Sequence, residues 1–170
     1  MIYLDNAATT RPCAEAVAAV NDALTARWGN PSAVHRLGIE AARLLRTARQ
    51  DVAEAMGAET ERVFFTSGGT EANNLAILGA VERMHGKQLV AVNATEHPSV
   101  LAAFERLREM GHEVRVLPVD GEGALDYEAL QKALNDGASL VSCMQVNNET
   151  GALLDVQRLK NAVADRALIH

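Results

Sequence analysis

Hydrophobic residues recur at helical spacing in the first third of the chain. Val17, Val20 and Leu24 lie three and four positions apart, which predicts a short amphipathic helix. A longer apolar stripe predicts a second helix over about 37–56, with arginine and glutamate side chains lying away from the stripe. Gly57 follows directly and suits a helix C-terminus. This part of the chain is therefore predicted to be mainly helical.

From residue 63 onward the pattern changes to short β-rich runs that alternate with helices. Strands are predicted over 63–65, 89–92, 114–119 and 140–146, and the start of another over 167–169. Helices are predicted over 70–84, 98–110, 126–135 and 155–165. Alternation at this spacing predicts an α/β fold, with a mostly parallel sheet between two layers of helices.

Ligands of such sheets bind beyond the carboxyl ends of the strands, so the residues that follow each predicted strand are of interest. After the first strand, residues 66–71 (TSGGTE) open a helix with two glycines and hydroxyl side chains. Glycines let the backbone approach a ligand closely, and free N–H groups at a helix start attract an anion such as a phosphate monoester. The alternative is an ordinary helix start capped by Ser67 or Thr70.

A histidine follows the second predicted strand. His97 lies where the chain turns into a helix, near the same edge of the sheet. An imidazole there can stack on a planar ring or transfer protons. The alternative is a half-exposed histidine that caps the helix.

Side-chain amides follow the fourth predicted strand, in residues 146–151 (VNNETG). They can hydrogen-bond a ligand's hydroxyl or carboxylate group, although Asn and Gly are also common in simple turns. Because a parallel sheet places all three segments at one edge, a phosphate cradle, an imidazole and an amide would surround one pocket. That combination predicts a site for a phosphorylated planar cofactor, with pyridoxal 5'-phosphate (PLP) as the candidate.

The composition narrows the classes of protein. A net charge of -6 argues against nucleic acid or an acidic membrane as the main partner. We expect no signal peptide, and no stretch reaches the roughly 18 apolar residues that a membrane-spanning helix needs. Two cysteines do not make a disulfide framework. We therefore expect a soluble cytoplasmic protein, without a metal site.

Five separated segments carry a family resemblance. They are 4–10 (LDNAATT), 29–32 (GNPS), 66–74 (TSGGTEANN), 95–97 (TEH) and 146–151 (VNNETG). These segments have the order and spacing found in cysteine desulfurases, and together they cover essentially the whole chain. The chain therefore resembles these PLP enzymes, which belong to the class V aminotransferase family and have fold type I.

The resemblance implies roles for individual residues. The backbone of Gly69 and the hydroxyl of Thr70 would hold the PLP phosphate. His97 would stack on the pyridine ring and take part in proton transfers, which makes it the candidate catalytic residue. Asn148 would lie beside the ring hydroxyl and the substrate.

The resemblance also implies how the chain is organised. Residues 1–14 would be an N-terminal segment, and residues 15–170 would be the N-terminal portion of the PLP-binding large domain. The region around Asn6 and Ala7, together with residues 30–35, would line the active-site region and the subunit contact.

The activity implied by the resemblance is the conversion of L-cysteine to L-alanine. The sulfur would pass as an enzyme persulfide to a sulfur-acceptor protein, for iron–sulfur cluster or thio-cofactor synthesis. The full-length enzyme would be a homodimer that contacts neither nucleic acid nor membrane. The alternatives are another class V PLP enzyme, such as a selenocysteine lyase or an aminotransferase, and a non-catalytic module that binds a partner through an open sheet edge.

The family pattern continues beyond His170. It includes an aspartate for the pyridine nitrogen, the Schiff-base lysine, the persulfide cysteine and an arginine for the substrate carboxylate. We therefore expect the chain to be an N-terminal part that is inactive on its own. Lys87, Lys132 and Lys160 are expected on the surface, and Cys143 is expected to be an inert core thiol within a strand.

Overall fold

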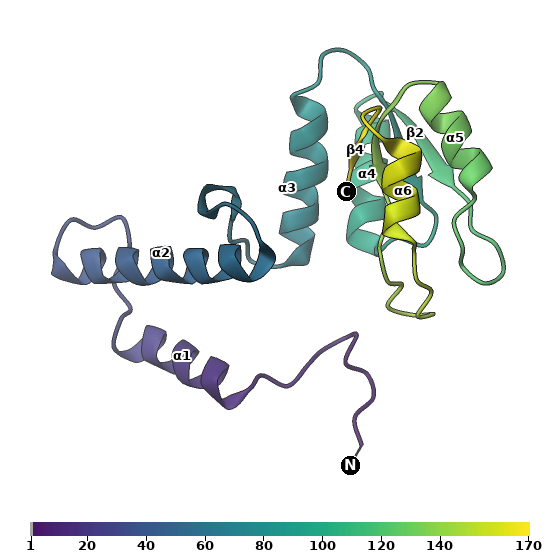
Figure 1. Cartoon of the computed structure of the whole chain (residues 1–170). Coiled ribbons are helices and arrows are strands. Elements are labelled where there is room, and N and C mark those ends of the chain that lie inside the picture. Colours follow the sequence, from purple (N-terminus) through teal and green to yellow (C-terminus); the bar gives the residue numbers. More distant parts are fainter. Residues whose placement is uncertain (1) are drawn as a thin grey trace. The chain divides into compact units, whose positions relative to one another are not determined.

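The computed structural model describes residues 2–170, and the chain divides into two compact units (Figure 1). Unit 1 is Met1–Phe65 and unit 2 is Thr66–His170. The proposed boundary between an N-terminal segment (1–14) and a PLP-binding portion (15–170) stays a prediction. Apart from Met1, that N-terminal segment lies within the described residues.

Unit 1 is helical, as its sequence pattern predicts. It contains α1 (Ala14–Thr25), α2 (Arg36–Met56) and a short 3-10 helix, η1 (Thr60–Arg62). Gly57 ends α2 in the left-handed conformation, with φ 62°, as expected for a glycine at this position. The other end of α2 is capped by His35, whose side chain accepts a hydrogen bond from the Gly38 N–H at 3.4 Å.

Two glycines of unit 1 lie against neighbouring backbone. A Cβ atom on Gly29 would lie 2.3 Å from the carbonyl oxygen of Leu37. A Cβ atom on Gly38 would lie 2.1 Å from the carbonyl oxygen of Ala33. The loop before α2 is therefore folded so closely onto the helix start that both positions require glycine.

Unit 2 is an α/β structure built on a four-stranded parallel sheet. The strands are β1 (Leu89–Asn93), β2 (Glu113–Leu117), β3 (Ala138–Ser142) and β4 (Leu168–Ile169). Their order across the sheet is β2-β1-β3-β4. The helices are α3 (Gly69–Glu82), α4 (Pro98–Glu109), α5 (Tyr127–Asn135) and α6 (Val156–Val163).

Helices cover both faces of this sheet. Alternate residues of a strand point to opposite faces, and in β1 Val90 lies in one core cluster whereas Ala91 lies in the other. The cluster with Val90 takes its helical members from α3 and α4, including Ile77 and Phe104. The cluster with Ala91 takes them from α5 and α6, including Leu130 and Leu159. The predicted three-layer α/β/α fold is confirmed, and Phe104 is the one aromatic residue among the described buried core residues, the rest of which are almost all aliphatic.

The predicted strand over 63–65 is wrong. Residues 63–65 follow η1 as extended chain without a strand partner, and Phe64 is 74% exposed. The Val63 carbonyl instead accepts a hydrogen bond from Nε of Arg49 at 3.0 Å. The guanidinium group of the same arginine lies 5.4 Å from the centroid of the Phe65 ring. A β-rich run thus packs on a helix instead of joining a sheet.

Two predicted strands end earlier than their apolar runs. Pro118 has no backbone N–H to continue a ladder, and β2 ends at Leu117. β3 ends at Ser142, and Val146 forms an isolated antiparallel bridge with Leu153. The chain after β3 therefore folds back on itself and leaves the sheet.

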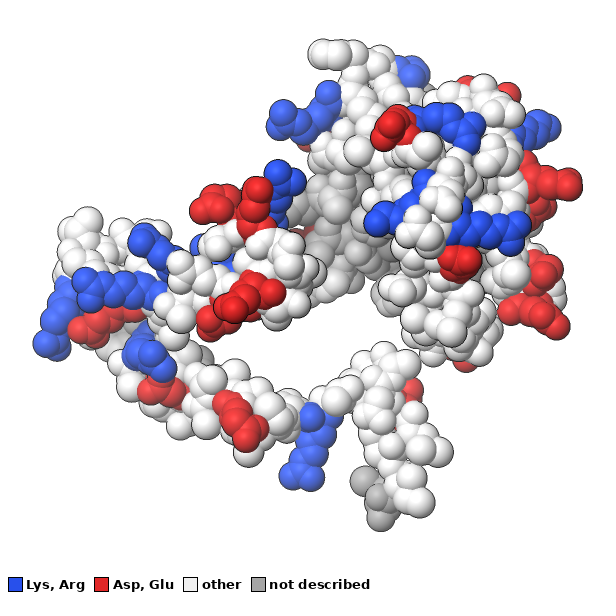
Figure 2. Space-filling view, in the orientation of Figure 1, with Lys and Arg blue, Asp and Glu red and all other residues white. Residues whose placement is uncertain are grey.

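Charged side chains are distributed over the surface. Figure 2 shows basic and acidic groups interspersed on the face in view. Several form exposed ion pairs, such as Arg106 with Glu109 and Arg62 with Glu59. Within the described part of the chain, no helix is both long enough and apolar enough to cross a membrane.

Candidate functional site

The predicted site residues of unit 2 belong to three segments. One is the start of α3, the second connects β1 to α4, and the third follows β3. In a parallel sheet the last two leave the same, carboxyl, edge. Hydrogen bonds made through Ser99 and Asn147 place all three together.

The start of α3 is open to solvent. Its N-cap is Gly68, which has no side-chain capping bond, so a cap by Ser67 or Thr70 is wrong. The Ser67 hydroxyl and N–H donate to the Glu71 carboxylate instead, both at 2.6 Å, and these bonds lower the pKa of Glu71. Nothing lies within 4 Å of a Cβ atom built on Gly69. The N–H groups of the first turn are therefore accessible to an anion.

His97 is the N-cap residue of α4. Its Nδ1 accepts a hydrogen bond from the Ser99 N–H at 3.1 Å and lies 2.7 Å from the Ser99 hydroxyl. An Nδ1 that accepts an amide N–H carries no proton, so we assign the neutral ring a proton on Nε2. The ring is exposed. The capping role that the sequence offered as the alternative is present, and it leaves the face of the ring and Nε2 accessible.

An amide from α3 supports this arrangement. Nδ2 of Asn73 donates to the Ser99 hydroxyl at 2.9 Å, and Ser99 is buried. The hydrogen bonds thus run from α3 through Ser99 to His97. They connect the helix that begins with the glycine-rich segment to the imidazole.

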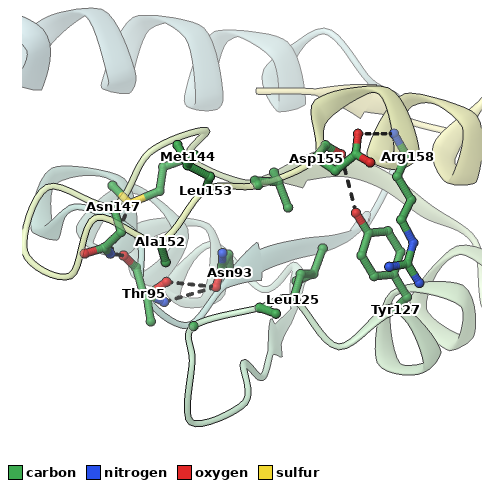
Figure 3. A pocket seen from close by; sticks show the side chains of 13 residues that line it. Asn93, Thr95, Leu125, Tyr127, Met144, Asn147, Ala152, Leu153, Asp155 and Arg158 are labelled. Carbon is green, nitrogen blue, oxygen red and sulfur yellow. Dashed lines mark hydrogen bonds between the residues drawn. The ribbon is translucent and has the colours of Figure 1, made fainter.

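The segment after β3 forms a turn. Asn148 is exposed in the turn 148–150, which agrees with the simple turn that the sequence offered as the alternative. Asn147 is buried and its Nδ2 donates to the carbonyl oxygen of Thr95 at 3.0 Å. Figure 3 shows these two residues side by side. This bond joins the segment of Asn148 to that of His97.

A buried polar group lies beside His97. The Ser142 hydroxyl donates to Oε1 of Glu96 at 3.1 Å and lies 2.9 Å from Nδ1 of His170. Burial raises the pKa of Glu96, and the hydrogen bond from Ser142 and the nearby His170 oppose that change. Glu96 and Ser142 are both buried. The end of β3, the end of β4 and the His97 segment are thereby connected.

A pocket of about 340 Å³ opens beside these groups. Its lining residues are Asn73, Glu96, His97, Val100, Cys143, Met144, Gln145 and His170. The expectation that Cys143 lies within a strand is wrong, because β3 ends one residue earlier, at Ser142. Burial raises the pKa of its thiol to about 12, so the thiol stays protonated at neutral pH and is inert, as expected.

A second pocket, of about 140 Å³, is lined by Asn147, Thr95 and Tyr127 among other residues (Figure 3). Arg158 stacks over the ring of Tyr127 there, at 3.8 Å from its centroid. The volume of this second pocket is well below the ~300 Å³ or more of typical small-molecule sites, whereas the volume of the pocket beside His97 reaches that range.

The site residues of unit 2 fit a phosphorylated ring. Accessible first-turn N–H groups suit a phosphate, an exposed imidazole suits an aromatic ring, and an exposed amide suits a hydroxyl. Of the four predicted binding residues, all of which the structure describes, His97 lines the larger pocket, and Gly69, Thr70 and Asn148 lie on the segments joined to it.

These segments are connected by Asn73, Ser99 and Asn147, a role that the sequence pattern does not predict. For Asn147 a local signal exists, because an asparagine often accepts hydrogen bonds from the N–H groups two and three residues later. The predicted surface lysines are exposed: Lys87, Lys132 and Lys160. Among residues 2–170, no three His, Cys, Asp or Glu side chains are grouped to hold a metal ion.

Comparison with known proteins identifies relatives over the whole chain. A family model described as Aminotransferase class-V matches residues 2–170. The chain is 42% identical over 172 residues to the NifS/IcsS protein homolog of Lactobacillus delbrueckii subsp. bulgaricus, covering 100% of this chain and 44% of that protein. It is 38% identical over 169 residues to the cysteine desulfurase NifS of Azotobacter vinelandii, covering 99% of this chain and 42% of that protein.

A solved structure gives the same result for the fold. A NifS-like protein superposes with a TM-score of 0.90 at 31% identity, over 99% of this chain and 48% of that one. The chain therefore spans less than half the length of these relatives.

Proposed function

The chain belongs to the class V aminotransferase family, and from this premise we propose that it forms the N-terminal part of a PLP-dependent cysteine desulfurase. The proposed reaction converts L-cysteine to L-alanine. The carbon–sulfur bond of the substrate breaks, and the sulfur joins a cysteine thiolate of the enzyme as a persulfide. A sulfur-acceptor protein then takes it for iron–sulfur cluster or thio-cofactor synthesis.

The observation that carries the proposal is the connection of three candidate segments. The bond from Asn73 to Ser99, and from Ser99 to His97, joins the start of α3 to the imidazole. The bond from Asn147 to the Thr95 carbonyl joins the imidazole's loop to the loop of Asn148. These contacts support one site at the carboxyl edge of the sheet.

Each candidate residue has a role that its surroundings support. The N–H groups of Gly69 and Thr70 lie in the first turn of α3, where the helix dipole favours a phosphate, and the Thr70 hydroxyl can donate a further hydrogen bond. The Asn148 amide can hydrogen-bond the ring hydroxyl of PLP. When bound, PLP supplies an electron sink for the substrate's carbon atoms.

His97 is the proposed proton carrier. The reaction removes and later restores the proton on the substrate's α-carbon, and it adds a proton to the β-carbon once the carbon–sulfur bond has broken, so a group near the ring must move protons. Nδ1 of His97 accepts the Ser99 N–H, so the ring would deliver the β-carbon proton from Nε2, and Nε2 could accept a proton again only after giving this one up. Stacking and proton movement are compatible, because they use the ring face and Nε2 respectively.

We also propose a homodimer located in the cytoplasm. Apolar side chains on α1, such as those of Val17 and Leu24, are exposed, and this supports assembly with a second subunit that would cover them. The two free cysteines, Cys13 and Cys143, support a reducing compartment. Sedimentation of the whole protein, and its localisation in fractionated cells, test these two statements.

Titration with pyridoxine 5'-phosphate tests the site. This alcohol analogue of PLP forms no Schiff base with surface lysines, so its fluorescence reports non-covalent binding alone. We expect saturable binding, weakened about three- to tenfold by His97→Ala through lost ring stacking. His85→Ala, at an exposed histidine, is the matched control. Equal affinity of the His97 variant and the control would retire the stacking role.

The reaction itself is tested on the whole protein from its natural source. We expect L-alanine to form from L-cysteine in amounts equal to the sulfur transferred. L-alanine formed from selenocysteine alone would instead support a selenocysteine lyase.

A further inference from the structure

Asn147 contacts two loops with the two ends of one amide. Its Oδ1 accepts hydrogen bonds from the N–H groups of Glu149 at 3.0 Å and Thr150 at 2.9 Å, and from the Thr150 hydroxyl at 3.1 Å. Its Nδ2 donates to the Thr95 carbonyl at 3.0 Å and lies 3.3 Å from the sulfur of Met144. The oxygen thus shapes its own turn, and the nitrogen reaches a loop 52 residues away in sequence.

Because Asn147 is buried, both the oxygen and the nitrogen of its amide need hydrogen-bond partners. A buried amide that loses a partner bears the full cost of being removed from water. The Thr95 end of the contact is also fixed, because the Thr95 N–H and hydroxyl both contact Oδ1 of Asn93, at 3.2 and 3.3 Å. Asn93 is the last residue of β1. The turn after β3 is therefore anchored to the end of β1 through Asn147.

From this geometry we infer that Asn147 is a positioning residue that holds Asn148 and His97 in register for the same ligand. Asn148 is the next residue in the turn that Oδ1 shapes, and His97 is two residues beyond the carbonyl that Nδ2 binds. Asn147 acts through these neighbours and has no role in the reaction itself. The inference rests on the proposed function, which gives Asn148 and His97 a common ligand.

The substitution Asn147→Asp separates the two ends of the amide. A carboxylate has the same shape and keeps the acceptor for Glu149 and Thr150, but it has no donor for the Thr95 carbonyl. Amide hydrogen exchange followed by NMR reports each loop without any ligand. We expect exchange at Thr95 and Glu96 to accelerate about tenfold, equivalent to the loss of about 1.4 kcal/mol of local stability. Exchange at Thr150 should change by less than about twofold.

Asn161→Asp is the matched control. Asn161 is exposed on α6, and its side-chain oxygen accepts a hydrogen bond from Gln157, which an aspartate would preserve. Its exchange pattern in both loops should match the parent protein. Unchanged exchange at Thr95 and Glu96 in Asn147→Asp would overturn the inference, because the nitrogen would then hold nothing in place.

Binding of pyridoxine 5'-phosphate tests the positioning of the ligand groups. We expect Asn147→Asp to weaken binding about tenfold when His97 is present, and by less than about twofold in the His97→Ala background. A merely structural effect would be the same in both backgrounds, and that additive result would overturn the inference. If the parent protein does not bind the analogue, the proposed function fails, and the exchange result alone decides whether Asn147 joins the loops.

Discussion

Two 12-residue helices, one in each unit, show how differently similar apolar patterns are used. In α1 of unit 1, Val17, Val20 and Leu24 are 54–72% exposed, and none of the residues of this helix, all of them described, is buried. In α4 of unit 2, Phe104 and Leu107 are at most 1% exposed. Helical spacing therefore defines an apolar face without defining what covers it.

The difference lies in what each unit supplies to its helices. Unit 2 contains a sheet with two apolar faces, and its helices cover both. The described part of unit 1 contains two α-helices and a 3-10 helix, and its backbone at Gly29 and Gly38 lies so close to neighbouring carbonyl groups that a Cβ atom would clash. Unit 2 is thus held mainly by apolar packing, whereas unit 1 depends on local backbone fit.

The largest expected effect contrasts the two helices directly. Phe104→Ala removes a fully buried ring from a core cluster, and we expect it to lower the free energy of unfolding by about 3–5 kcal/mol. Leu24→Ala on the exposed face of α1 should change it by less than about 0.5 kcal/mol while the chain is monomeric. Urea denaturation followed by far-UV circular dichroism measures both. Equal losses would mean that the face of α1 is covered in solution.

Glycine-to-alanine substitutions should have opposite signs in the two units. Gly38→Ala brings a Cβ atom against the Ala33 carbonyl, and we expect a loss of about 1–3 kcal/mol in unit 1. Gly79→Ala in α3 meets nothing within 4 Å and should add about 0.5–1 kcal/mol, because alanine favours a helix. The fluorescence of the single tryptophan, Trp28, follows unit 1, and circular dichroism follows the helices of both units, so a circular dichroism change without a Trp28 change reports unit 2. A neutral Gly38→Ala would contradict the backbone-fit account.

Helix caps give a smaller contrast. Asp126 caps α5 by accepting hydrogen bonds from the N–H groups of Glu128 and Ala129, at 2.9 and 3.0 Å. Asp126→Ala should therefore cost about 1 kcal/mol. His35→Ala removes one 3.4 Å contact at the start of α2 and should cost less than about 0.5 kcal/mol. Thermal and urea unfolding of both variants check the order, and a larger loss for His35→Ala would reverse it.

The smallest expected effect depends on pH. Burial raises the pKa of Glu96 above its ordinary 4.5, so the folded state holds this proton more tightly than the unfolded state. The stabilisation from this proton is complete below the unfolded-state pKa of 4.5, and it is lost as pH rises through the higher folded-state pKa. Glu96→Gln keeps an acceptor for Ser142 but does not titrate. Relative to the parent, the variant should gain stability from acidic toward neutral pH, and a pH-independent difference would contradict the assignment.

Local signals allowed much of the fold to be predicted. Gly57 ends α2 and Asp126 caps α5, because each acts on its own helix turn. The run at 63–65 was predicted as a strand because β propensity says nothing of whether a pairing strand exists. The strand predicted over 140–146 extends beyond the observed end of β3 for a related reason. The point at which a strand leaves its ladder depends on the neighbouring strands, which the apolar run does not reveal.

The candidate site was predictable in its segments but not in its connections. The glycines at the start of α3 and the turn after β3 have local signatures. The bond from Asn73 to Ser99 spans 26 residues and the bond from Asn147 to Thr95 spans 52. Neither distance corresponds to a helical or strand period, so only the folded backbone brings these side chains together.

The strand order β2-β1-β3-β4 has a consequence for synthesis on the ribosome. β1 is made before the other three described strands, yet it lies inside the sheet, and its neighbour β3 is bonded to it across 50 residues, through Ser139 and Leu89. Parallel neighbours cannot be joined by a tight turn, so each pairing closes a long loop. The nascent chain therefore carries β1 with an open edge until α5 and β3 have been translated. Chaperones would be most needed during that interval.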